Sequence, residues 1–369
     1  MTDGKTKPLT KKYLSLVLII VAVAIGVCGV RVWFGPQWQS VDGGYREVMG
    51  TFAHIVAVAI DDKTAKACIE AGFNQLRRVD ELMSDYKSDS QVSMVNRDAF
   101  AKAVVVDDDL FEVLSIAAEY SKESNGAFDV TVGPVVDLWR KAEDTGWMPT
   151  EDELALARSK VGCQKLILDE EAKTVSFAVE GMRLDLGGIA KGYAIDLAVE
   201  AMQKAGAVGG LIDVGGDIRC FGTPPNSKES WLVGLQDPTV DDQLLLVLKL
   251  RDMAVATSGD YQRFTEIDGK RYSHIINPQA GSSADELSSV SIVARTATAA
   301  DALATAVSVM SLAEGLELIG SLDETEAILI PAGKGADLIH TEGIRQYIDT
   351  SGPVPVYSTA SKVAGQSKS

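Results

Sequence analysis

The sequence predicts an α+β protein in which mixed or antiparallel sheets pack against helices. Short β-branched segments come in hairpin-like groups, several longer segments repeat apolar residues at helical spacing, and strict strand–helix alternation is absent. The chain has 369 residues, of which 46% are hydrophobic and 24% charged. This composition excludes a disordered or collagen-like chain, and the length allows a large core without disulfides.

The helices are predicted from apolar periodicity and capping residues. Residues 62–84 repeat apolar side chains every three or four positions, and Asp61 or Asp62 can cap the first turn. A capping-box pattern at residues 150–153 starts another helix. The other helices are expected at residues 107–121, 189–205 and 298–311.

The strands are predicted from short apolar or alternating runs bounded by turn residues. They are expected at residues 51–59, 165–168, 174–179, 210–214, 231–235, 244–250 and 327–331. Residues 38–47 are polar and are expected to form a connector.

The N-terminal segment has the composition of a membrane anchor. Residues 13–30 carry no charge, and extension to residue 34 reaches the roughly 20 residues that span a bilayer. Lys11 and Lys12 precede the run, which places residues 1–12 in the cytoplasm. We therefore expect a transmembrane signal anchor at 13–34, a connector at 35–48, a catalytic body at 49–350 and a flexible tail at 351–369.

This arrangement places the protein at the cell inner membrane, single-pass or lipid-anchored, with the body on the periplasmic side. A cleaved signal peptide is the main alternative, but the apolar run is long and no A-x-A site follows it. Lipidation at Cys28 is disfavoured because Val27 is larger than the small residue expected before a lipoprotein cysteine.

Charge and cysteine content exclude further classes. The formal net charge of −17 disfavours general nucleic-acid binding, although it allows a small anionic ligand to bind locally. Cys28 lies in the apolar run and leaves an odd number of cysteines, which disfavours a disulfide framework, and the absence of a CxxC pair gives no support to a cysteine-based zinc site.

Two motifs could hold an anion and a cation. The glycine pair Gly187-Gly188 precedes a predicted helix, and its amides together with Lys191 could bind phosphate, although a plain tight turn explains the same residues. Asp301 and Thr305 lie one helical turn apart, so their oxygens suit Mg²⁺, although a helix cap and a first-turn acid are the alternative.

Three other segments are candidates for ligand contact. His274 lies among polar residues of a turn-bounded strand and could act as an acid–base group or bind phosphate. Phe128 follows Gly126-Ala127 and could line a ring-binding pocket, although a core position is the ordinary explanation. Residues 211–217 are expected to form a strand that ends in a glycine pair, which by itself indicates only a turn.

Taken in this order, these segments resemble the ApbE family, the FAD:protein FMN transferases. The resemblance runs from Met49 to Ile330 and includes Met49-Gly50-Thr51 and the segments 83–90 and 256–261. It implies an ApbE-like, T-fold-related α+β fold that binds FAD and Mg²⁺ in a cleft. The implied reaction is attack by a Thr or Ser hydroxyl of an acceptor protein on FAD, which transfers FMN and releases AMP.

The resemblance also implies roles for individual residues. The residues implied to line the FAD site are Met49, Tyr86, Ala127, Phe128, Asp129, Asp185, Lys191 and Ile275. Those implied to hold the metal are Gly188 (through its carbonyl), Asp301 and Thr305. His274 would lie near the diphosphate and is our candidate general base, with Asp260 as the competitor. Asn277 departs from the pattern, since family members often have Asp before the proline.

The partners follow from the same resemblance. The implied acceptor is a flavoprotein subunit of a membrane redox complex, such as the Na⁺-translocating NADH:quinone reductase. Two other functions remain open on the sequence alone: a Mg²⁺-dependent FAD diphosphatase, with water as acceptor, and a non-enzymatic, membrane-tethered flavin-binding protein.

Overall fold

The computed structural model describes residues 38–225, 229–238, 240, 243–259, 264–267, 269–333 and 337–350. The expected anchor at 13–34, the tail at 351–369 and Asp260 lie outside this range. No helix within the described residues has the length and apolar character needed to cross a bilayer.

An eight-stranded sheet organises the described part of the chain, and every pair of neighbouring strands in it is antiparallel. Its strands, in spatial order, are β1 (Gln39–Val48), β2 (Thr51–Ala59), β6 (Gly209–Val214), β7 (Asp217–Gly222), β10 (Met253–Gly259), β13 (Leu287–Ala294), β14 (Glu326–Pro331) and β15 (Ile339–His340). This confirms the predicted combination of antiparallel sheet and helices.

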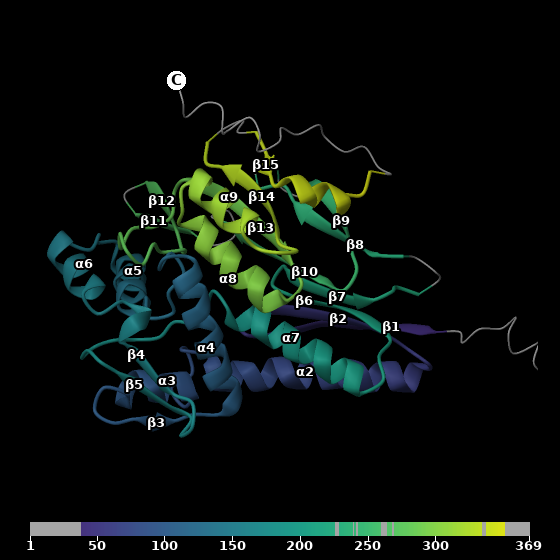
Figure 1. Ribbon diagram of the computed structural model, residues 1–369, viewed down its shortest axis with the longest axis horizontal. Helices are drawn as coiled ribbons and strands as arrows, with labels where there is room; N and C mark the ends of the chain where they lie inside the picture. The colour runs from purple at the N-terminus through teal and green to yellow at the C-terminus, as the bar shows by residue number, and fades with distance from the viewer. Residues whose placement is uncertain are drawn as a thin grey trace, which may run out of the picture.

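Helices cover one face of this sheet and a hairpin covers the other (Figure 1). The helices are α2 (Asp62–Met83), α7 (Ala190–Lys204) and α8 (Ala297–Ser308); the hairpin is β8 (Trp231–Gln236) and β9 (Leu244–Leu250). Strand alternation supplies both cores, since Ile55 of β2 packs under the helices whereas Val58 packs under the hairpin.

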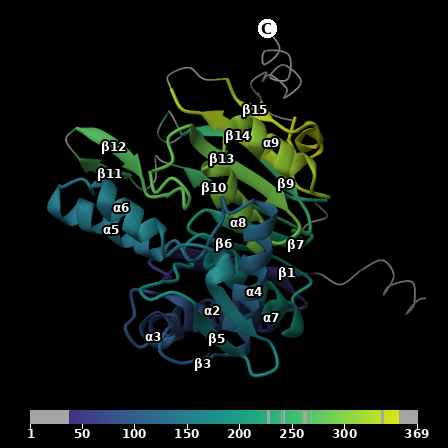
Figure 2. The same cartoon turned by 60° about the vertical axis from the view of Figure 1, so that its left-hand side comes forward.

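The remaining elements gather at one side of the sheet, where α3 to α6 and the small sheets lie (Figure 2). The helices are α3 (Gln91–Asp98), α4 (Asp108–Glu123), α5 (Gly133–Thr145) and α6 (Glu151–Arg158), with the short η1 (Cys163–Lys165). The small sheets pair β3 (Val104–Val105), β5 (Thr174–Phe177) and β4 (Leu166–Asp169), and β11 (Phe264–Ile267) with β12 (Lys270–Ser273). Towards the C-terminus follow α9 (Leu312–Gly320) and η2 (Glu342–Gln346).

Most of the predicted elements are confirmed. The helix expected at 62–84 is α2, capped by Asp61, and the capping box at Thr150 and Glu153 begins α6. The helix expected at 298–311 ends earlier, at Ser308, because Ser311 caps the separate helix α9.

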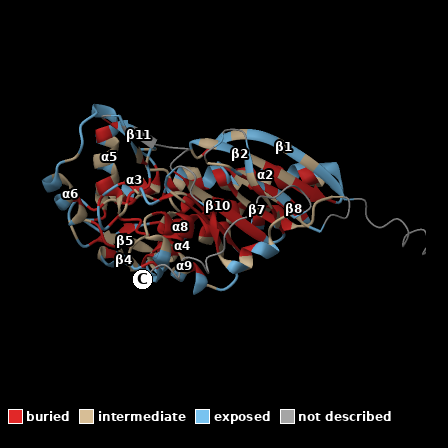
Figure 3. Ribbon diagram, turned by 90° about the horizontal axis from the view of Figure 1, so that it is seen from above, coloured by how far each residue is buried: buried red, intermediate tan, exposed pale blue. Residues whose placement is uncertain are grey.

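The connector expected at residues 38–47 is wrong. Residues Gln39–Val48 form the edge strand β1, so the folded domain begins before Met49. β1 is mostly exposed, as Figure 3 shows, and a bulge interrupts its pairing between Asp42 and Tyr45. An edge strand that faces water lacks the apolar alternation by which strands are recognised.

Candidate active site

Lys191 joins two buried carboxylates where α7 meets α8 and the sheet. Its ammonium forms ion pairs with Asp217, the first residue of β7, and with Asp301 of α8, the latter at 3.2 Å. Both aspartates are only 3% exposed. The other Asp301 oxygen accepts a hydrogen bond of 3.0 Å from the backbone N–H of Gly192. This carboxylate therefore ties α8 to the first turn of α7.

Gly192 makes this close approach possible. A Cβ at this position would lie 2.2 Å from the carbonyl oxygen of Ala297 and 2.8 Å from the Cα of Thr298. Any larger residue would push the two helices apart, because the atoms it would meet belong to the backbone. The glycine therefore sets the distance between Lys191 and Asp301.

The electrostatics of the cluster follow from one ammonium serving two carboxylates. Burial raises the pKa of Asp217 to about 7; Lys191 opposes the rise, and Asp301 adds to it. For Lys191, burial lowers the pKa, but the attraction of Asp217 and Asp301 outweighs burial and holds the pKa above its ordinary value. The Lys191 ammonium therefore stays protonated, and the Asp217 carboxylate is the group of this cluster that takes up a proton.

The three residues expected to hold a metal come together. Thr305 Oγ1 lies 2.7 Å from the position that a Cβ on Gly188 would occupy, and Asp301 is one turn earlier on α8. Within the described residues, no group of three or more His, Cys, Asp and Glu side chains could hold a metal ion. A carbonyl, a hydroxyl and one carboxylate are nevertheless the hard oxygen donors that Mg²⁺ takes, with its shell completed by other oxygens. These donors fit the expected ion.

The glycine turns at one end of the sheet lie beside this cluster. The β1–β2 turn contains Met49, which has a φ of +54°, and Thr51, two residues later, packs against Gly215 of the β6–β7 turn. Asp217 closes that second turn, and its carboxylate accepts a hydrogen bond of 3.3 Å from the Thr257 N–H. The half-buried Met49 thus reaches the sheet end where Asp217 meets Lys191.

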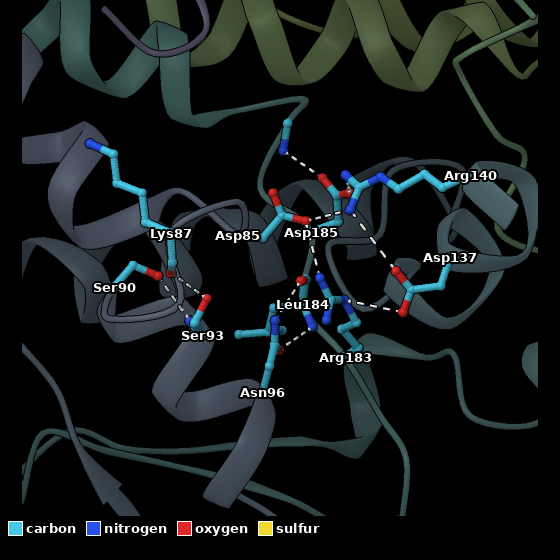
Figure 4. Close-up of polar contacts among 11 residues, drawn as sticks. Asp85, Lys87, Ser90, Ser93, Asn96, Asp137, Arg140, Arg183, Leu184 and Asp185 are labelled. Atoms are coloured by element: carbon cyan, nitrogen blue, oxygen red, sulfur yellow. Dashed lines mark hydrogen bonds and ion pairs between the residues drawn. The ribbon is translucent and has the colours of Figure 1, made fainter. Parts of the chain in front are cut away.

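Asp185 is linked to Tyr86 through Arg140, and Figure 4 shows the contact between Asp185 and Arg140. One Asp185 oxygen accepts a hydrogen bond of 2.8 Å from the Gly187 N–H, which shapes the glycine turn. The other oxygen is 3.0 Å from the Arg140 guanidinium, which also lies 4.9 Å from the centre of the Tyr86 ring. Tyr86 is 80% exposed, so one face of its ring is available to a ligand.

The segment 127–129 serves the core more than a ligand. Phe128 is buried and meets Tyr120 edge-on, as the core interpretation expects. The Asp129 carboxylate accepts hydrogen bonds from the N–H and hydroxyl of Thr131 and from the N–H of Cys163. The Val130 carbonyl, directly after Asp129, accepts a hydrogen bond from the Asp185 N–H. The backbone of Phe128 and Asp129, together with the half-buried Ala127, is therefore the part of this segment that lies close to the site.

The His274 segment is held between α8 and the end of α4. His274 is exposed and Ile275 is buried. The Asn277 amide donates to the Val309 carbonyl, and its oxygen accepts from two N–H groups of the following turn. The Asn277 side chain, at the position where family members often have Asp, therefore stabilises the turn that follows it. Asp260, the competing base, lies outside the described residues.

The sequence does not mark two residues of this region. Asp217 is visible only as the end of a glycine turn, although an acid directly after a glycine pair is a signal for a side chain at the end of a sheet. Arg140 gave no signal, because its partners Asp85 and Asp185 are 55 and 45 residues away in the chain.

The fold is that of an α+β protein, with helices on one face of an antiparallel sheet. Its polar site lies at a helix–helix junction, where two buried carboxylates hold a lysine beside a glycine turn. A model of the ApbE family matches residues 49–329, and the chain belongs to this family.

Among curated relatives, the FAD:protein FMN transferase of Treponema pallidum is 32% identical over 85% of this chain and 90% of its own length. That of Haemophilus influenzae is 33% identical, over 81% and 88%. The solved ApbE structure from Thermotoga maritima superposes with a TM-score of 0.76, at 29% identity, over 85% of this chain and all of its own. The flavin transferase ApbE of Vibrio cholerae gives 0.74 at 27% identity, over 84% of this chain and 99% of its own.

Proposed function

We propose that the protein transfers the FMN half of FAD to a Thr or Ser hydroxyl of an acceptor protein, in a Mg²⁺-dependent reaction that releases AMP. The observation that carries the proposal is the junction of Gly188, Lys191, Asp301 and Thr305, which gathers oxygen donors and a cation beside a glycine turn. Relatives that share most of this chain's length are named FAD:protein FMN transferases.

The residues that would hold FAD are those carried over from the family. Lys191 would contact the diphosphate, because a shared ammonium can turn from Asp217 or Asp301 towards an entering anion. The remaining FAD contacts are proposed for Met49, Tyr86, Ala127, Phe128, Asp129, Asp185 and Ile275, with the segment 127–129 acting through its backbone.

The transfer exchanges one P–O bond for another. The acceptor hydroxyl oxygen bonds to the phosphorus on the flavin side, and the bond from that phosphorus to the bridging oxygen breaks, so that AMP leaves with the electron pair. His274 takes the hydroxyl proton, a role for which its exposure is suitable, since the acceptor must reach it. Mg²⁺, held by Gly188, Asp301 and Thr305, would offset the negative charge of the phosphate oxygens.

The setting is proposed from the sequence alone. We infer that residues 13–34 anchor the protein in the inner membrane, single-pass or through a lipid, with residues 49–350 on the periplasmic side and 351–369 as a tail. A flavoprotein subunit of the Na⁺-translocating NADH:quinone reductase type is the proposed acceptor. Anchoring both proteins in one membrane raises their effective concentration.

Mass spectrometry of the acceptor tests the activity. The full-length protein in detergent is incubated with FAD, Mg²⁺ and this acceptor subunit, and free AMP is measured in parallel. We expect the acceptor to gain one FMN mass for each AMP released. Release of FMN and AMP without a modified acceptor indicates the diphosphatase instead, and bound FAD without any AMP indicates a binding protein.

Two variants test the assigned roles. His274→Ala is expected to bind FAD normally and lose at least about 100-fold in transfer rate, as removal of a general base does. His54→Ala is the control, because the His54 ring stacks on Tyr45 and pairs with Asp42 of β1 and is outside the His274 segment. Wild-type turnover of His274→Ala would refute the role of this residue.

A further inference from the structure

Asp185 belongs to a network of arginines and aspartates next to Tyr86, and the proposed reaction does not by itself require this network. Among the described residues, the guanidinium groups of Arg140 and Arg183 face the carboxylates of Asp85, Asp137 and Asp185 (Figure 4). The side chains come from the end of α2, from α5 and from the segment before the glycine turn. Contacts within the network therefore fix these three parts of the chain relative to one another.

Arg140 is the member of this network that contacts Asp85, Asp185 and Tyr86 at the same time. Its Nη1 donates to Asp85 at 2.6 Å and its Nη2 to Asp185 at 3.0 Å. The same guanidinium lies over the ring of Tyr86. A planar fork can make two ion pairs and stack on a ring at the same time, whereas a lysine ammonium cannot.

Asp185 transmits this position to the glycine turn. Its second oxygen holds the Gly187 N–H, directly before Gly188. The preceding residue, Leu184, is fixed on both sides by the Asn96 amide, which donates to the Leu184 carbonyl at 3.0 Å and accepts from its N–H at 2.6 Å. The turn therefore follows a segment that Asn96 holds, and the Asp185 carboxylate connects it to Arg140.

The network also matters for an anionic ligand. Without a partner, Asp85 and Asp185 would present two negative charges beside Tyr86, in a protein that is already strongly acidic. Burial and the nearby Asp85 both raise the pKa of Asp185, and Arg140 opposes them. The guanidinium therefore keeps this carboxylate available as an acceptor while cancelling much of its charge.

We propose that Arg140 is a positioning residue for the dinucleotide: it holds Tyr86 and the Asp185 turn at a fixed separation, so that one aromatic ring of the ligand stacks on Tyr86 while its diphosphate lies at Gly187 and Gly188. This inference rests on the proposed function. It deepens it by assigning ligand affinity to a side chain on α5 that need not touch the reacting phosphorus.

The experiment compares Arg140→Gln, Arg140→Lys and a matched control, Arg46→Gln, in the full-length protein. Arg46 resembles Arg140 in being 35% exposed against 32%, in pairing with a carboxylate (Glu70), and in lying over an aromatic ring, that of Phe73. Because Arg46 is on β1, its loss reports the general cost of removing such an arginine.

Three quantities are measured: the Kd of FAD from quenching of flavin fluorescence, kcat for the transfer, and the midpoint of thermal unfolding. We expect Arg140→Gln to weaken FAD binding about tenfold or more, the equivalent of one charge-assisted hydrogen bond, with kcat at saturating FAD within about twofold of wild type. Arg140→Lys should recover only part of the affinity. Arg46→Gln should shift the unfolding midpoint similarly and leave the Kd unchanged.

The proposal is overturned if Arg140→Gln binds FAD as the wild type does, or if Arg140→Lys fully restores affinity, since charge alone would then suffice. It is also overturned if Arg46→Gln weakens binding equally. Failure of the proposed function looks different: the wild type itself would then leave the acceptor unmodified, whatever the Kd of FAD in the Arg140 variants.

Discussion

Substitution of Gly192 by alanine tests the contact on which the site depends. The new Cβ would lie 2.2 Å from the Ala297 carbonyl oxygen, whereas real Cβ contacts almost never fall below 3.0 Å. Since the obstructing atoms are backbone, α7 and α8 must separate by about 1 Å, and close-packed interiors resist such a shift. The Lys191–Asp301 ion pair and the Gly192–Asp301 hydrogen bond would both lengthen.

Two effects of opposite sign decide the change in stability. Alanine is the better helix former by about 1 kcal/mol, and overpacking a core costs about 1–3 kcal/mol, or more where backbone is displaced. We expect overpacking to win, with a net loss of about 1–3 kcal/mol in the free energy of unfolding. A displacement of about 1 Å at the reacting groups should also lower the transfer rate about 100-fold.

Urea unfolding and the acceptor mass assay measure the two outcomes. Gly320→Ala is the control: this glycine ends α9, and a Cβ there meets no atom within 4 Å. The control should be as stable as the wild type or slightly more stable. If Gly192→Ala keeps both wild-type stability and wild-type activity, the close approach of α7 and α8 does not determine the site.

Three further outcomes are expected. The pKa of Asp217 is about 7 in the folded protein against 3.8 in the unfolded chain, so the folded state binds the proton more strongly. The contribution of Asp217 to the free energy of unfolding therefore falls as the pH rises from about 4 to 7. Asp217→Asn should flatten this decline in urea midpoints measured with EDTA. Asp129→Ala should cost about 3 kcal/mol in urea unfolding, because three buried donors lose their acceptor, and Asp129→Asn should cost less. Ser311→Ala breaks the capping box of α9 and should cost about 1 kcal/mol, whereas equal stability would show that the cap is dispensable.

The sequence predicts those elements that have a strong apolar period or a clear cap. The helix α2 is recognised from its stripe of buried residues, and α6 from its capping box. The strands β1 and β13 are missed for opposite reasons: β1 faces water, and most of β13 is buried, so neither alternates. Strand order could not be predicted either, because pairing between distant segments leaves no local signal.

The site is predictable where a local motif carries it. Gly188, Lys191, Asp301 and Thr305 are found from a glycine turn and a one-turn spacing, and the structure brings them together. Arg140 is missed because its importance lies in contacts with segments that are distant in the chain. For Phe128 and Asp129 the sequence does not show which way the side chains face; the fold buries both, and the Asp129 carboxylate accepts from the Cys163 N–H.

The strand β1 also sets the distance between the start of the described chain and the turn that contains Met49. Gln39 pairs with Ala59 at one end of the β1–β2 ladder, and Val48 pairs with Thr51 at the other, beside Met49. At about 3.3 Å per residue, these ends are roughly 30 Å apart. If the proposed anchor at residues 13–34 lies in a bilayer, the ladder allows up to this distance between the start of the folded domain and the Met49 turn, which an acceptor hydroxyl would have to reach.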